Sequence, residues 1–330
     1  MKDGIIVPKA AASSDKHPWL GELPDIGGGR FSFAVMGDRT GLQIPGIFES
    51  AVSAAAGLHP DFIISVGDLV EGYCTAAEKA GACRDWEATL ALLNGLGVPF
   101  FTAVGNHDYG NPLQVEIWKK YFGHEYYAFR IGKVLFLVLN TVERLAAPFE
   151  EGAVRLMRSA ARSVRQHPRR EREIAAHVTR VLNAGNSNLD TAESLSLRLS
   201  QRQMDFAEAT VRANRDAARV CIVTHLPFWK GKKTKQYEDL MRLCAGIPLT
   251  VIAGHLHTLE YTEKGDRAFI QIGRTGGICW GPAGRGGFHH FLWVNVENGE
   301  MEFTVFPVQK EMDLSDYQTA ALDSEKRKLL

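Results

Sequence analysis

Five short apolar segments of this sequence each end at residues with polar or charged side chains. The clearest, residues 98–104, stops at Gly105-Asn106-His107-Asp108. A short apolar run bounded by Gly is typical of a buried β-strand. The segments between the runs at 31–36, 61–66 and 98–104 have apolar residues at helical spacing. Such an alternation of strands and helices predicts a layered α/β fold. The other four runs are residues 31–36, 61–66, 219–223 and 249–253.

The side chains at these strand ends seldom occur in a protein core without a partner. Carboxylates, amides and imidazoles lose hydration when they are buried, so each needs a hydrogen bond or a metal ion. The carboxyl ends of neighbouring strands in an open α/β sheet lie along one edge, which can bring distant residues together. The residues at these ends are Asp38, Asp68, Asn106, His107, His225, His255 and His257.

Each of these residues, taken alone, has an ordinary structural explanation. Asp38 and Asp68 could cap helices that follow the strands, and the histidines could lie in turns. Taken together, oxygen and nitrogen donors without a thiolate suit divalent or trivalent first-row metals. An aspartate shared by two ions would hold them roughly 3.5–4 Å apart, the spacing of hydrolytic two-metal sites. We therefore predict a binuclear hydrolase.

The ordered blocks resemble those of the calcineurin-like metallophosphoesterases, and the strand before each block matches as well. The resemblance covers about residues 31–307. It implies an α/β (α+β) fold of two facing mixed β-sheets flanked by helices. It also implies hydrolysis of phosphomonoester or phosphodiester bonds in a small or macromolecular substrate. The blocks are Gly37-Asp38, Gly67-Asp68, Gly105-Asn106-His107-Asp108, Thr224-His225 and Gly254-His255-Leu256-His257.

The resemblance further implies two bound metal ions, for which Mn, Fe or Zn is expected. Asp38 and His257 would hold the first ion, and Asp68 would bridge the two. A hydroxide held between the ions would attack phosphorus in line. The second ion would be held by Asn106, His225 and His255.

Residues beside the expected metal ligands suggest further roles. His107 would donate a proton or hydrogen bond to the leaving oxygen, and Asp108 would orient its imidazole and raise its pKa. Arg39 and Thr40 are the candidate substrate-binding residues, and Arg39 could clamp a phosphate oxygen or form a surface ion pair. Among the aromatic residues, Trp229, Tyr73 and Trp280 could line a substrate groove or pack locally.

One position departs from the family pattern. Most members have His two residues after the first Asp, where this chain has Thr40. We interpret the change as an altered metal preference or affinity. The Thr40 hydroxyl, a water molecule or Gln43 could fill the vacant place. The alternative function is a catalytically weakened member that binds phosphorylated ligands or protein partners.

The chain is expected to have three parts: an irregular leader over residues 1–30, a metallophosphoesterase domain over 31–310 and a terminal helix over 311–330. A helical insertion is expected at about 145–197, where the segment 155–182 holds eight Arg against two Glu. This Arg-rich insertion could be a basic lid that attracts a polyanion, but a solvated helical pair is favoured.

Overall composition restricts the partners and the compartment. Equal numbers of basic and acidic residues, 38 of each, leave no net field to recruit nucleic acid, so that partner is possible but not favoured. The lysine-rich loop 230–235 could steer anions locally. No apolar run is long enough for a transmembrane segment, and no signal peptide is visible. A cytoplasmic location is favoured, and a periplasmic or secreted one stays open if a signal was removed. Five cysteines fit reduced thiols, although Cys74 and Cys83 could pair.

Overall fold

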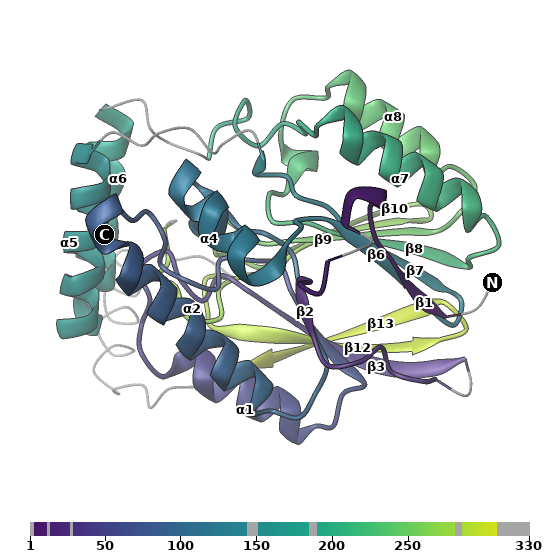
Figure 1. Cartoon of the computed structure of the whole chain (residues 1–330), viewed down its shortest axis with the longest axis horizontal. Coiled ribbons are helices and arrows are strands. Elements are labelled where there is room, and N and C mark those ends of the chain that lie inside the picture. Colours follow the sequence, from purple (N-terminus) through teal and green to yellow (C-terminus); the bar gives the residue numbers. More distant parts are fainter. Residues whose placement is uncertain are drawn as a thin grey trace, which may run out of the picture.

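The chain forms two mixed β-sheets that face each other, with helices on the outer side of each sheet (Figure 1). This computed structural model describes residues 3–11, 14–26, 29–143, 151–184, 190–280 and 286–308. The two facing sheets with flanking helices confirm the architecture that the family resemblance implies.

The first sheet has six strands in the order β13-β12-β3-β4-β5-β2. Its central strands β3, β4 and β5 run parallel, while β12 and β2 pair with them antiparallel. The apolar sequences of the central strands are largely buried, as expected for parallel strands covered on both faces. The strands are β2 (Trp19–Leu20), β3 (Arg30–Met36), β4 (Phe62–Ser65), β5 (Phe100–Thr102), β12 (His290–Glu297) and β13 (Glu300–Pro307).

The second sheet has seven strands in the order β1-β6-β7-β8-β9-β11-β10. Strands β7, β8, β9 and β11 run parallel, and antiparallel strands complete the sheet at both edges. Strands β6 and β7 form a hairpin across Gly132-Lys133. The strands are β1 (Gly4–Ile6), β6 (Tyr127–Ile131), β7 (Val134–Val138), β8 (Arg219–Val223), β9 (Leu249–Ala253), β10 (Glu260–Lys264) and β11 (Arg267–Gln271).

Aromatic side chains fill the space between the two sheets. Phe33 stacks on Phe62 with ring centroids 4.9 Å apart. Phe136 meets Phe62 edge-on at 5.5 Å and stacks on Phe129 at 4.6 Å. Such rings bury large areas in specific geometries, so they fix how the sheets lie against each other. The strand ends of both sheets are therefore held at defined positions.

Helices cover the outer faces of the sheets. Helices α1 (Ile47–Gly57), α2 (Lys79–Asn94) and α4 (Pro112–Phe122) pack on the six-stranded sheet. Helices α7 (Gln201–Ala213) and α8 (Lys235–Leu243) pack on the seven-stranded sheet, opposite α1 and α2 in Figure 1. The strand–helix alternation thus produces the layers that the sequence predicts.

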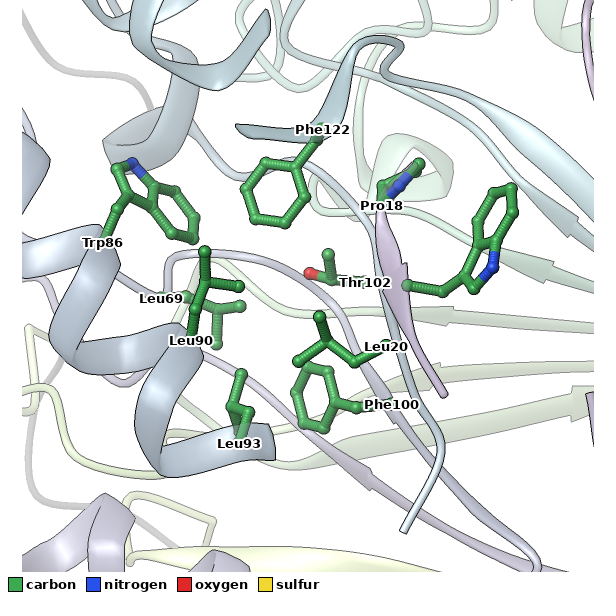
Figure 2. A pocket seen from close by; sticks show the side chains of 10 residues that line it. Pro18, Leu20, Leu69, Trp86, Leu90, Leu93, Phe100, Thr102 and Phe122 are labelled. Carbon is green, nitrogen blue, oxygen red and sulfur yellow. The ribbon is translucent and has the colours of Figure 1, made fainter. Parts of the chain in front are cut away.

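A small apolar cavity lies between α2, α4 and strands β2 and β5 (Figure 2). Trp86, Leu90, Phe100 and Phe122 are among the side chains that line it, as Figure 2 shows. Its volume is about 10 Å³, no more than one water molecule occupies. This cavity is a packing feature of the core and is too small for a substrate.

The segment predicted as an Arg-rich insertion contains helices α5 (Glu151–Gln166) and α6 (Glu171–Ala184). Val164 and Val178 are fully buried, in one cluster with Leu42, Ile47 and Ile278 of the main body. The helical pair is therefore packed on the domain through an apolar face, although many of its arginines point outward. Residues 145–150 and 185–189 of the predicted insertion lie outside the described residues.

The leader is less irregular than the sequence predicts. Strand β1 pairs with β6, and β2 pairs with β5, each antiparallel. These strands are only three and two residues long, so their periodicity is too short to recognise before the partner strand is known. The terminal helix predicted for 311–330 lies outside the described residues.

No helix in the described part of the chain is both long and apolar enough to span a bilayer. All five cysteines are free thiols, so Cys74 and Cys83 are not joined.

Candidate metal centre

The six residues predicted as metal ligands lie together at the carboxyl ends of strands from both sheets. Three of them follow β3, β4 and β5 of the six-stranded sheet, and three follow β8 and β9 of the seven-stranded sheet. Their side chains converge although their positions in the chain span more than two hundred residues. The residues are Asp38, Asp68, Asn106, His225, His255 and His257, and all are buried.

Asp68, Asn106, His225 and His255 form what we call the four-ligand cluster. Oδ1 of Asn106 lies 2.8 Å from Nε2 of His225 and 2.8 Å from Nδ1 of His255. Nε2 of His225 is also 3.3 Å from Oδ2 of Asp68. Donor atoms about 3.3 Å apart match a tetrahedral ion with bonds of about 2.0–2.1 Å. The donors of Asn106, His225 and His255 lie 2.8–3.3 Å from one another, a spacing that fits a single metal ion, and Asp68 adjoins them beside His225.

Asp38, Asp68 and His257 form what we call the three-ligand cluster. Each of these side chains offers one ligand atom within 4.8 Å of the others. Nε2 of His257 lies 3.6 Å from Oδ1 of Asp38. Asp68 belongs to both clusters, which is the position expected of a residue that bridges two ions.

Backbone contacts turn the free nitrogens of two histidines toward the clusters. Nδ1 of His225 donates to the carbonyl of Val66 at 2.9 Å, and Nδ1 of His257 donates to that of Ile278 at 2.5 Å. A carbonyl only accepts, so we assign the lone pair of each neutral ring to Nε2. Nε2 of His225 then faces the oxygen of Asn106, a contact that either a metal ion or a proton on Nε2 would satisfy.

Burial and neighbouring charges shift the pKa values of the titratable residues in this site. Burial raises the pKa of Asp38 to about 8, and the nearby charge of Asp68 contributes to the rise. Burial would lower the pKa of His225, but the charge and hydrogen bond of Asp68 raise it to about 9. In the absence of metal, a proton on His225 thus supplies the positive charge. Burial lowers the pKa of His257 to about 3, so this imidazole is neutral and able to bind a metal.

Four of the predicted ligands have a strained backbone. The φ angle is +50° at Asp38, +58° at Asp68, +75° at His255 and +57° at His257. Residues other than glycine rarely adopt this left-handed region, and they persist there when the surrounding structure holds them. Backbone strain concentrated at these residues supports a functional site over an ordinary arrangement of turns.

The glycines of the motifs allow the chain to approach the ligands closely. A Cβ on Gly105 would lie 2.1 Å from Oδ1 of Asp68, and one on Gly254 would lie 2.3 Å from Oδ2 of Asp38. No side chain fits at either position without displacing a ligand. Glycine at these positions is thus part of the site.

Comparison with known proteins agrees with this geometry. The profile of the calcineurin-like phosphoesterase family matches residues 33–259, which is more than half of the chain. The chain belongs to this family. Every metal-ligand candidate of this phosphoesterase domain lies within the matched residues.

Curated relatives match a smaller part of the chain. The mouse (Mus musculus) serine/threonine-protein phosphatase CPPED1 is 30% identical over 148 residues, which cover 40% of this chain and 47% of the mouse protein. The human (Homo sapiens) protein of the same name is 32% identical over 98 residues, covering 28% of this chain and 31% of the human protein. The chain thus spans about half the length, or less, of these relatives.

Solved structures share the fold at low sequence identity. Purple acid phosphatase PPD1 from yellow lupin (Lupinus luteus) seeds has a TM-score of 0.54 at 12% identity, covering 86% of this chain and 52% of the lupin chain. PhoD also has a TM-score of 0.54, at 10% identity, covering 86% of this chain and 69% of its own. These likenesses confirm the phosphoesterase fold.

His107 lies next to the metal centre of this phosphoesterase domain and has a different partner from the one predicted. Its Nδ1 donates to the carbonyl of Glu71 at 2.8 Å and lies 4.0 Å from the Glu71 carboxylate. The ring of Tyr73 packs edge-on against it with centroids 4.7 Å apart. The sequence analysis does not single out Glu71. The one feature that could have identified it is its position three residues after the metal-ligand candidate Asp68.

Asp108 does not orient His107, and that prediction is wrong. Its carboxylate accepts backbone N–H groups from Asp68 at 2.8 Å, Leu69 at 2.9 Å and Gly105 at 3.0 Å. The physical reason is that α3 (Asn106–Tyr109) is a single helical turn, which directs Asp108 at its own N-terminus and at the turn after β4. Asp108 therefore holds Asp68 in place.

Thr40 and Arg39 also differ from their predicted substrate-binding roles. The Thr40 hydroxyl donates to Oε2 of Glu71 at 2.5 Å. Arg39 donates to the Leu69 carbonyl at 3.0 Å and forms an ion pair with Glu49 at 2.9 Å, which leaves no free guanidinium fork for a phosphate. Both residues support the loop after β3. Of the two alternatives for Arg39, its surroundings match the ion pair.

The aromatic candidates have distinct surroundings. The hydroxyl of Tyr73 accepts a hydrogen bond of 2.7 Å from Nδ2 of Asn106, which directs Oδ1 of Asn106 toward the ligands. The Trp280 ring lies 6.4 Å from that of His257, at the border of the three-ligand cluster. Trp229 packs against Phe269 of β11, as its local-packing alternative describes.

The lysine-rich loop carries less free charge than its sequence suggests. Lys230 pairs with Glu260 at 2.8 Å, and Lys235 pairs with Asp239 at 2.5 Å. Lys232 pairs with Glu193 at 2.6 Å. Ion pairs that neutralise three of its lysines weaken the case for steering of anions by this loop.

Proposed function

We propose that this chain is a metal-dependent hydrolase of phosphoester bonds that holds one ion in each cluster. One observation carries the proposal: nitrogen and oxygen ligand atoms from five strand ends converge on one buried site. The chain that holds this site belongs to the calcineurin-like phosphoesterase family. Two ions bound there would supply an activated water for attack on phosphorus and would neutralise the phosphoryl oxygens.

The residues around the clusters have separate tasks in this proposal. Asp68 joins the two halves of the site, and Asp108 fixes its backbone. Nδ1 of His107 is occupied by the carbonyl of Glu71. When His107 is protonated on both nitrogens, Nε2 carries the proton that would pass to the leaving oxygen of the substrate and leave His107 neutral.

Metal-restored hydrolysis tests the proposal. Protein stripped with a chelator would be assayed on para-nitrophenyl phosphate and bis-para-nitrophenyl phosphate, before and after separate addition of Mn²⁺, Fe²⁺, Zn²⁺, Ni²⁺ and Mg²⁺. We expect at least one metal to restore turnover, and the preferred substrate assigns the chain to monoesterases or diesterases. The curated relatives are named serine/threonine-protein phosphatases, so phosphoserine and phosphothreonine peptides belong in the same assay.

Two results would contradict the proposal in different ways. A protein that binds no metal would remove the metal centre altogether. A protein that binds two ions and hydrolyses none of these substrates would favour the alternative, a family member that binds phosphorylated ligands without turnover.

The role of His107 is tested by His107→Ala. Loss of a general acid lowers the turnover rate about 10²–10⁴-fold, and we expect metal content to stay unchanged because His107 is not a ligand. The control is His177→Ala, which alters an exposed histidine on α6. Loss of metal in His107→Ala would show that this residue belongs to the coordination shell instead.

A further inference from the structure

The insertion reaches the metal centre at its far end, where it rejoins the main chain. Asp190 follows α6 and precedes α7, and its Oδ1 lies 3.3 Å from Nε2 of His255. This residue is outside all of the sequence blocks that identify the family.

His255 requires an acceptor at that position. Its Nδ1 faces Asn106 and His225 inside the four-ligand cluster, so Nε2 is the nitrogen that carries the hydrogen. Nε2 of His255 is shielded from solvent, and it forms no conventional hydrogen bond within the described residues. The carboxylate of Asp190 is the group that it faces.

We propose that Asp190 is a positioning residue that holds His255 for metal binding, so that the insertion forms part of the metal centre. The inference rests on the proposed metal centre and adds a residue of the insertion to it. A carboxylate that accepts from the second nitrogen of a metal-bound histidine fixes the ring and makes it a stronger ligand. Asp190 would thus act on the metal through His255 and would not touch it.

A second contact ties the insertion to the three-ligand cluster. Glu171, the first residue of α6, accepts from Nη1 of the buried Arg274 at 2.6 Å. Nη1 of Arg274 also donates to the carbonyl of Gly277 at 3.0 Å. The neighbouring carbonyl of Ile278 is the one that orients His257. Two contacts of the insertion therefore lead to the two histidines of the Gly-His-x-His motif.

A calorimetric titration of the chelator-stripped full chain with Mn²⁺ tests the role of Asp190. We expect Asp190→Ala to weaken one of two binding steps by about 10–100-fold, the usual effect of losing such a partner. Asp190→Asn should weaken it less, because an amide oxygen still accepts from Nε2. The control is Asp205→Ala, an exposed aspartate on α7, which should leave both steps unchanged.

Double substitution separates positioning from general destabilisation. In a His255→Ala background, Asp190→Ala should have no further effect on Mn²⁺ affinity, because its only route to the metal is gone. Equal affinity in wild type and Asp190→Ala would overturn the inference while leaving the proposed function intact. If wild type binds no Mn²⁺ and none of the other metals, the proposed function itself fails.

Discussion

The two halves of the metal centre differ in how completely the chain surrounds them. In the four-ligand cluster every donor lies within 3.3 Å of another donor, and Tyr73 and Val66 orient two of the side chains. In the three-ligand cluster, Thr40 occupies the position of the usual family histidine and turns to Glu71 instead. Fewer protein ligands leave more of the coordination shell to water or substrate. We therefore expect the four-ligand cluster to bind its ion more tightly.

Asp68→Asn should abolish the difference in metal affinity between the two clusters, because Asp68 belongs to both. We expect both ions to be lost together and turnover to fall by at least roughly 10³-fold, since metal ions supply several kcal/mol of transition-state stabilisation. Metal analysis after gel filtration and a phosphatase assay measure the two effects. Retention of two ions with full activity would remove Asp68 as the bridge.

His225→Ala and His257→Ala sharpen the comparison by emptying one cluster at a time. We expect His225→Ala to remove the tighter Mn²⁺-binding step and His257→Ala to remove the weaker one. Each protein should retain about one ion, and each should lose most of its turnover because both ions act on one substrate. Calorimetric titration identifies which step disappears, and the reverse assignment would refute the ranking of the clusters.

Tyr73→Phe makes the smallest change, since it removes only the hydroxyl that orients Asn106. A hydrogen bond of this kind contributes about 1 kcal/mol, which corresponds to about a fivefold change in affinity. We expect that loss in the tighter binding step alone, measured in the same titration. An equal loss at both steps would indicate that the ring, and not the hydroxyl, supports the site.

Much of the fold and the metal centre is predictable because short-range patterns determine both. An apolar strand followed by glycine and a polar residue has few other interpretations, and five such patterns require a common edge. The run before Asn106 and the run before Asp68 are examples, since each ends within four residues of its ligand. The hairpin of β6 and β7 follows from a two-residue turn between apolar runs.

Contacts between side chains far apart in the sequence were not predictable. The sequence suggests a contact between Asp108 and its neighbour His107, but the direction of a single helical turn brings Asp108 to Asp68 and Leu69 instead. Glu71 and Asp190 cannot be recognised from the sequence, because no local pattern marks a carboxylate that supports a ligand. Strands β1 and β2 exist only through their pairing with β6 and β5, which the leader sequence does not reveal.

The left-handed backbone at Asp38, Asp68, His255 and His257 bears on how this protein can change during evolution. Each such residue costs of order 1–3 kcal/mol relative to an unstrained one, and glycine at the same position would avoid most of that cost. Drift toward a more stable chain would therefore erode the metal centre first, since marginal stability exposes strained functional positions to replacement. Four such residues in one site indicate a benefit other than stability, because their strain adds nothing to folding.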